Sequence, residues 1–292
     1  MPMGEFCIRG SRQFDVDSGN GTFRVFVYRP ASRPPADGFP VIYGLDGNAH
    51  FTSLITSMKA HSVRPELTGL GPAVVVGIGY PIEDDHDLDR RTFDYSPDAD
   101  PSWLGERPDG LPWPEVGGAE AFLSFLEDRI KPEIAASESI DPERQSLFGH
   151  SFGGLCTLYA ALTRPQAFRH FLVSSPSIWY AEKRILSFID GFAERLSTVQ
   201  DRRDLFLSIG SLEQTVPPFL DERWPAYAHW IRRNNMVGNI RALHQTLAQM
   251  SLPLLDLKFH EFEGEHHGSV PPVSINMAMK IALKPARSGR VP

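Results

Sequence analysis

Residues 145–163, QSLFGHSFGGLCTLYAALT, hold the pattern that predicts the fold class of this chain. An apolar run ends in the Gly-x-Ser-x-Gly turn of residues 149–153, and the alanines and leucines that follow have helical spacing. This strand–turn–helix order is the setting of a nucleophile elbow, which presents Ser151 at the start of a helix. Glycines at 149 and 153 let strand and helix approach each other without a Cβ clash. The alternative is a serine that only caps a helix after a glycine-rich turn.

The segments on either side of this turn alternate between apolar strands and helices. Strand patterns, rich in β-branched and aromatic residues, occur at 22–30, 40–47, 73–81, 145–151, 170–180, 204–211 and 256–264. Helical patterns occur at 50–63 and 118–136. The alternation predicts an α/β domain, with a mostly parallel sheet and helices on both faces. Together with the nucleophile elbow, it favours an α/β-hydrolase fold. Residues 12–18 and 22–30 flank a Gly-Asn-Gly turn, so we expect an antiparallel hairpin at the N-terminal edge.

The chain shows no internal repeat and no low-complexity linker, so we expect residues 1–292 to form a single domain. Residues 81–116 interrupt the alternation with prolines, acids and aromatic residues, which predicts a long ordered loop insertion. Residues 216–227, with two prolines and Trp224, are a candidate lid.

Composition excludes several classes of function. The formal net charge is −7, and the acidic residues are spread along the chain, which argues against a nucleic-acid partner. The apolar runs are all shorter than a membrane helix requires, so we expect no membrane partner. The two cysteines, Cys7 and Cys156, are expected to be free thiols. The N-terminal residues lack the pattern of a secretory signal, so a cytoplasmic location is expected.

A serine nucleophile needs a base and an acid, which follow it in α/β-hydrolases in the order Ser, acid, His. Glu213 comes just after the strand pattern at 204–211, and Asp204 and Asp190 are the alternative acids. His266 and His267 follow the last strand pattern, and the glycine at 268 favours His267. His260 lies within that strand pattern, so we expect it to be structural.

An ester transition state also needs two backbone N–H groups aimed at the developing oxyanion. One is expected from Phe152, the residue after the nucleophile. The other is expected from Gly47 or Asn48, in the loop after the strand pattern at 40–47. Asp46 in the same loop precedes the nucleophile in the chain, so it is interpreted as a residue that shapes the loop.

With these residues in place, the chain resembles the esterase D-like α/β-hydrolases, and within them the siderophore esterases that hydrolyse enterobactin and bacillibactin. The segments YGLDGNAHF, RRTFDYSP, FGHSFGGL, SIGSLEQ and FEGEHHGSVPP carry the resemblance over nearly the whole chain. It implies Ser151 as nucleophile, His267 as base, and backbone N–H groups near Asn48 and Phe152 as oxyanion donors. Because Glu213 is present, the chain looks more like the cytoplasmic bacillibactin-type enzymes with a full triad.

Other residues are candidates for contact with the substrate. Arg90 or Arg91 at the mouth of a pocket would bind anionic groups of a ferric siderophore, but Asp94 would equally pair with one arginine and anchor the loop. Trp103, Trp179 and His150 are further candidates for the substrate pocket. For His150, next to the nucleophile, packing near the elbow is the alternative.

These observations predict a serine esterase that acts through an acyl-enzyme. The resemblance implies a siderophore trilactone as the preferred small-molecule substrate. This chemistry requires no cofactor and no metal. A general short-chain carboxylesterase or acetylesterase and an acyltransferase are alternatives of similar chemistry. A non-catalytic binding module on the same fold is the alternative of another class.

Overall fold

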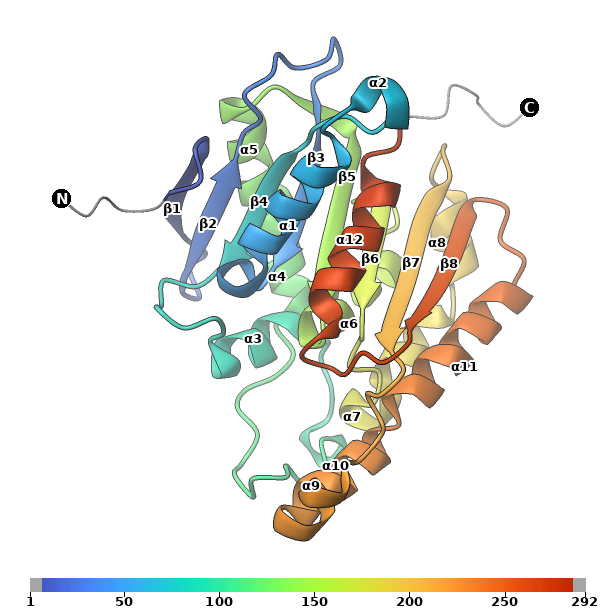
Figure 1. Cartoon of the computed structure of the whole chain (residues 1–292). Helices are drawn as coiled ribbons and strands as arrows, with labels where there is room; N and C mark the ends of the chain where they lie inside the picture. Colours follow the sequence, from blue (N-terminus) through green and yellow to red (C-terminus); the bar gives the residue numbers. More distant parts are fainter. Residues whose placement is uncertain (1–6, 286–292) are drawn as a thin grey trace, which may run out of the picture.

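A computed structural model describes residues 7–285 of the chain, and its strands form one eight-stranded sheet with helices packed on both faces (Figure 1). The strands are β1 (Ser11–Asp17), β2 (Thr22–Tyr28), β3 (Phe39–Leu45), β4 (Val74–Gly79), β5 (Ile140–His150), β6 (His170–Ser174), β7 (Arg203–Gly210) and β8 (Leu255–Phe262). Their spatial order is β1-β2-β4-β3-β5-β6-β7-β8. The helices are α1 (Gly47–His61), α2 (Pro65–Thr68), α3 (Leu88–Tyr95), α4 (Ala119–Phe125), α5 (Lys131–Ser137), α6 (Phe152–Thr163), α7 (Tyr180–Lys183), α8 (Phe192–Ser197), α9 (Pro218–Arg223), α10 (Pro225–Asn234), α11 (Met236–Gln249) and α12 (Val270–Ala282).

Strand pairing confirms the predicted fold class. β4, β3, β5, β6, β7 and β8 pair in parallel, whereas β1 pairs antiparallel with β2 and β2 with β4. Every residue of β3 and β4 is buried, as expected for central strands that are covered on both faces. β1, in contrast, is exposed along most of its length, as expected at the edge of a sheet.

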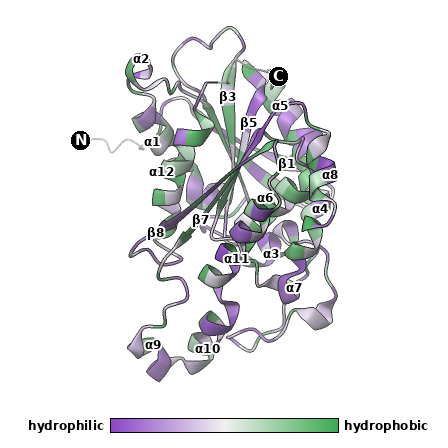
Figure 2. Cartoon of the chain, turned by 90° about the vertical axis from the view of Figure 1, so that its right-hand side faces the viewer, coloured by the Kyte–Doolittle hydropathy of each residue, from purple (hydrophilic) through white to green (hydrophobic). Residues whose placement is uncertain are grey.

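Two apolar layers hold the helices to the sheet (Figure 2). α1 and α12 lie side by side on one face, where Leu54 and Ile55 pack with Ile275 and Met279. The opposite face is covered by α4, α6, α8 and α11, and α6 is buried along nearly its whole length. This burial explains why the segment after Ser151 contains almost no polar residue: it is a helix without a solvent face.

Two segments differ from the sequence-based expectation, and a third, the candidate lid, contains helices that the sequence analysis did not address. Residues 81–116 are not irregular throughout, because Asp87 caps the eight-residue helix α3 by accepting a hydrogen bond from Arg90 N. The candidate lid at 216–227 contains α9 and the start of α10, each with proline in its first turn. The strand expected over 170–180 ends at Ser174, where Ser175 adopts φ 44° and Pro176 offers no N–H to a ladder.

The helical pattern at 118–136 forms α4 and α5, joined by a π-helical turn at Leu126–Ile130. Pro132 lacks an N–H donor, and the wider turn lies just before it. Among residues 7–285, none of the helices is long and apolar enough to cross a bilayer. Cys156 is buried, Cys7 is exposed, and both are free thiols as expected.

Candidate active site

Ser151 occupies a strained turn between β5 and α6, with φ 60° and ψ −118°. Such a conformation persists only where the surroundings enforce it, and it aims the hydroxyl away from both elements. A Cβ on Gly149 would lie 2.0 Å from the carbonyl oxygen of Gly153, and a Cβ on Gly154 would lie 2.5 Å from Ser174 O. The clash predicted from the glycine spacing is therefore confirmed at Gly149.

The structure brings Ser151 into contact with His267, and His267 with Glu213. Ser151 Oγ lies 3.0 Å from His267 Nε2, and His267 Nδ1 lies 2.6 Å from Glu213 Oε2. Because a carboxylate only accepts, Nδ1 carries the hydrogen and Nε2 accepts from the serine hydroxyl. Ser151 follows β5, His267 follows β8 and Glu213 follows β7. Because these strands are parallel, their carboxyl ends lie together, and so do the three residues.

The alternative residues do not take part in the contacts among Ser151, His267 and Glu213, although His266 lines the same cavity as Ser151. His266 accepts a hydrogen bond from Gly268 N at 3.2 Å, and His260 lies within β8. The carboxylate of Asp204 accepts hydrogen bonds from His170 Nδ1 at 2.9 Å and from Lys258 Nζ at 2.6 Å, so it is paired with residues other than His267.

A buried environment holds the Glu213 carboxylate in position. Its side chain is inaccessible to solvent, and Oε1 accepts hydrogen bonds from Ser175 Oγ at 2.5 Å and from Gly210 N at 2.8 Å. Ser175 is a site residue that the sequence analysis missed. Its only signal is its place directly after the strand β6, and the positive φ that turns its hydroxyl toward Glu213 is visible only in the structure.

His150, a candidate for the substrate pocket, packs against the ring of His267, as its alternative role near the elbow expected. Its ring centroid lies 4.6 Å from that of His267, and its Nδ1 lies 3.1 Å from Ser174 Oγ. Burial holds the pKa of His150 well below its ordinary value, with the nearby His267 as a smaller cause. A neutral ring beside His267 does not repel a positive charge on that imidazole.

Two helices begin beside Ser151. Phe152 is the first residue of α6, and Gly47 and Asn48 are the first residues of α1. Backbone N–H groups in a first helical turn have no acceptor within the helix, so they are available to an anion. The Asn48 side chain holds this loop in place, because it accepts from Tyr80 N at 2.9 Å and donates to Tyr80 O at 3.1 Å.

Arg91 and Arg90 both pair with acids. Arg91 is buried and donates from Nε and Nη2 to the two carboxylate oxygens of Asp46, each at 2.9 Å. Asp46 itself adopts φ 52° before α1, in keeping with its expected role in shaping the loop. Arg90 donates to Thr22 O at 2.8 Å and pairs with Asp94 at 3.4 Å, as the structural alternative expected.

A cavity of about 410 Å³ opens beside Ser151 and His267. Its wall is mainly apolar and includes Trp179, a residue predicted from sequence, whose ring lies 5.2 Å from that of Trp230. Pro217 and Tyr227 in this wall belong to the candidate lid at 216–227. The sequence analysis missed the other apolar side chains of the wall, which are Leu212, Trp230, Ile231 and Met236. Neither Arg90 nor Arg91 is among the residues that line this cavity.

A second cavity of about 400 Å³ shares Trp179 and Asn234 with the first. Trp103, predicted as a substrate contact, lies in its wall and is 41% exposed. Two exposed cations, Lys183 and Arg233, and one exposed acid, Glu182, also line it. Positive charge next to the apolar cavity therefore comes from Lys183 and Arg233.

The chain is similar to known esterases in sequence and to a solved structure in fold. Residues 17–268 match the model of the Esterase family. The chain is 38% identical over 282 residues to the ferri-bacillibactin esterase BesA of Bacillus subtilis, covering 96% of this chain and 92% of that protein. It is 38% identical over 240 residues to the siderophore enterobactin esterase of Emericella nidulans, covering 78% and 77% of the two chains. The crystal structure of the BES protein from Bacillus cereus superposes with a TM-score of 0.83 at 33% identity, covering 97% of this chain and 98% of that one.

Proposed function

Because the chain belongs to the Esterase family, we propose that it is a serine esterase that hydrolyses a siderophore trilactone of the enterobactin or bacillibactin type. The observation that carries the proposal is the continuous chain of contacts from Ser151 through His267 to Glu213. In this reading Ser151 is the nucleophile, His267 the general base and Glu213 the acid that orients and stabilises the imidazolium.

The reaction follows from these positions. Ser151 Oγ attacks the ester carbonyl carbon while His267 Nε2 takes the hydroxyl proton. The oxyanion accepts hydrogen bonds from Phe152 N and from Gly47 N or Asn48 N. His267 then protonates the departing alkoxide, which leaves the acyl group on Ser151. Water, activated by the same imidazole, releases the acid and restores the serine.

The cavity beside Ser151 supports an aromatic acyl group. A volume of about 410 Å³ is at the small end of ligand pockets, so it holds one arm of a trilactone while the remainder lies outside. Trp179, Tyr227 and Trp230 offer ring faces and edges to an aryl group. Tyr227 and Pro217 belong to the candidate lid at 216–227, which supports a role for this segment in shaping the acyl site.

Charge supports the same class of substrate. A ferric catecholate siderophore is an anion. Lys183 and Arg233 line the cavity next to the one at Ser151, and with Glu182 in the same wall one net positive charge remains. We assign attraction of the anionic chelate to these two residues, whereas Arg90 and Arg91 anchor the loop through Asp94 and Asp46.

Mass-spectrometric product analysis tests this function. The purified chain, incubated with ferric enterobactin and ferric bacillibactin, is expected to release linear ester fragments and then monomer units. Ser151→Ala is the control and is expected to release none. An acid quench during turnover should also show the acyl mass on wild-type protein, in the peptide that contains Ser151. Turnover of p-nitrophenyl acetate without cleavage of either siderophore would instead indicate a general short-chain carboxylesterase.

A further inference from the structure

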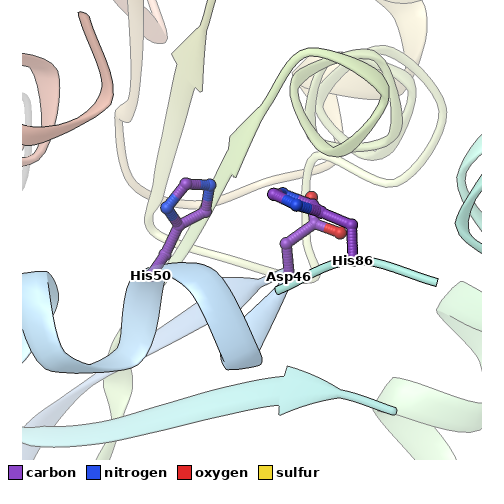
Figure 3. Close-up of side chains that lie close together, drawn as sticks. All are labelled: Asp46, His50 and His86. Carbon is purple, nitrogen blue, oxygen red and sulfur yellow. The ribbon is translucent and has the colours of Figure 1, made fainter. Parts of the chain in front are cut away.

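Three side chains of types that can bind a metal ion lie together at the start of α1 (Figure 3). Asp46 precedes α1, His50 lies one helical turn later, and His86 comes from the segment between β4 and α3. One ligand atom from each lies within 4.8 Å of the other two. The spacing of four residues between Asp46 and His50 places both on one side of the helix start, and only the fold adds His86.

The His50 side chain has a ring nitrogen that is free to bind a ligand. Its side chain is nearly buried, with 7% exposure, and among the described residues its Nε2 has no hydrogen-bond partner. An unpaired buried polar atom is uncommon and calls for a ligand or a function. Burial lowers the pKa of His50 to about 4. Burial also lowers the pKa of the half-buried His86.

The charges around the cluster permit a cation. Burial acts to raise the pKa of Asp46, but the charge and hydrogen bonds of Arg91 outweigh that effect and hold the pKa below its ordinary value. Each of its oxygens accepts one hydrogen bond from Arg91 and has a second lone pair. Asp85 lies close enough to act on the pKa of both histidines, so Asp46, Asp85 and Arg91 together have one net negative charge.

We propose that Asp46, His50 and His86 bind a divalent first-row transition ion such as Zn²⁺ or Fe²⁺. Two imidazole nitrogens and one carboxylate oxygen suit these ions, whereas Mg²⁺ and Ca²⁺ need mostly oxygen ligands. Because the protein supplies three ligand atoms, water would fill the remaining coordination positions of the ion. The positive charge of Arg91 weakens the binding, so the ion exchanges with solution instead of supporting the fold as a structural zinc does.

Metal titration of chelator-treated protein tests the proposal. We expect wild type to bind one equivalent of Co²⁺, with a d–d absorption spectrum of nitrogen and oxygen ligation, and Zn²⁺ to displace it. Zn²⁺ should also raise the melting temperature, because it binds the folded chain. His86→Ala, at a half-buried position, should weaken Co²⁺ binding about tenfold or more, since even the loss of a group that only supports a ligand costs about that much. His50→Gln should do the same.

Two further histidine variants are the controls. His229→Ala removes an exposed imidazole on α10, and His266→Ala removes one beside His267. Both should bind Co²⁺ as wild type does. The proposal is wrong if wild type shows no such spectrum, if His86→Ala and His50→Gln bind Co²⁺ unchanged, or if His266→Ala alone abolishes binding. None of these measurements depends on ester hydrolysis, so the proposed esterase activity is tested separately.

Discussion

Replacement of Glu213 by Gln separates the role of its charge from that of its shape. The glutamine oxygen can keep the bonds from Ser175 Oγ and Gly210 N, so the fold should be retained. The new NH₂ group would face His267 Nδ1, which is now 2.6 Å from a carboxylate oxygen. Two donors cannot bond to each other, so the imidazole would change tautomer and could no longer accept from Ser151.

The size of the effect follows from the geometry. Opposite charges with centres about 4 Å apart interact by about 4 kcal/mol at an effective dielectric constant of about 20. The His267 side chain is 46% exposed, so water screens part of this interaction and about 2 to 4 kcal/mol remains. That range corresponds to a loss of about 30- to 1000-fold in kcat. The wrong tautomer adds to the loss, so we expect a value near the upper end.

Steady-state hydrolysis of p-nitrophenyl acetate measures kcat, and thermal unfolding checks that the variant is folded. Glu265→Gln is the matched control, because this carboxylate lies two residues before His267 and bonds to Ser269 Oγ. It should keep nearly full activity. A folded Glu213→Gln protein with kcat within about tenfold of wild type would refute the assignment of Glu213 as the triad acid.

Three further predictions concern the charged cavity, the buried acid of α3 and the elbow. Arg233→Gln should lower kcat/KM about two- to fivefold for a ferric siderophore but leave kcat/KM for p-nitrophenyl acetate unchanged. Arg232→Gln is the control. Equal effects of Arg233→Gln on both substrates would contradict the role given to Arg233. Burial raises the pKa of Asp94 to about 6 from its ordinary 3.8, so the folded state keeps this proton to a higher pH than the unfolded chain does. The folded state therefore loses about 3 kcal/mol of stability as pH rises from about 4 to 6. Urea unfolding across this range should show that Asp94→Asn loses correspondingly less stability, and an identical pH dependence would exclude Asp94 as its source. Gly149→Ala puts a Cβ against the backbone and should destabilise the fold by about 3 kcal/mol or prevent folding. Gly71→Ala is the control, because the position has open space around it, and it should unfold in urea as wild type does. Equal stability of the two variants would contradict the clash.

Chain order and local pattern were enough to predict the fold class and the candidate triad. Ser151, Glu213 and His267 each follow an apolar strand, and the ends of parallel strands meet at one edge of the sheet. The glycine at 149 indicated a tight turn, because only a residue without Cβ fits the approach of strand and helix. These features depend on backbone periodicity and turn chemistry, which a short stretch of sequence carries by itself.

Only the tertiary structure determined which side chains meet across long separations. Sequence alone left Arg91 equally suited to a substrate or to an acid, and the fold pairs it with Asp46, 45 residues earlier. Trp179 and Trp230 share a cavity wall because α10 returns to the end of the sheet, and no periodicity relates their positions. His86 joins His50 for the same reason. Such contacts depend on the path of loops between elements, which propensity and pattern do not specify.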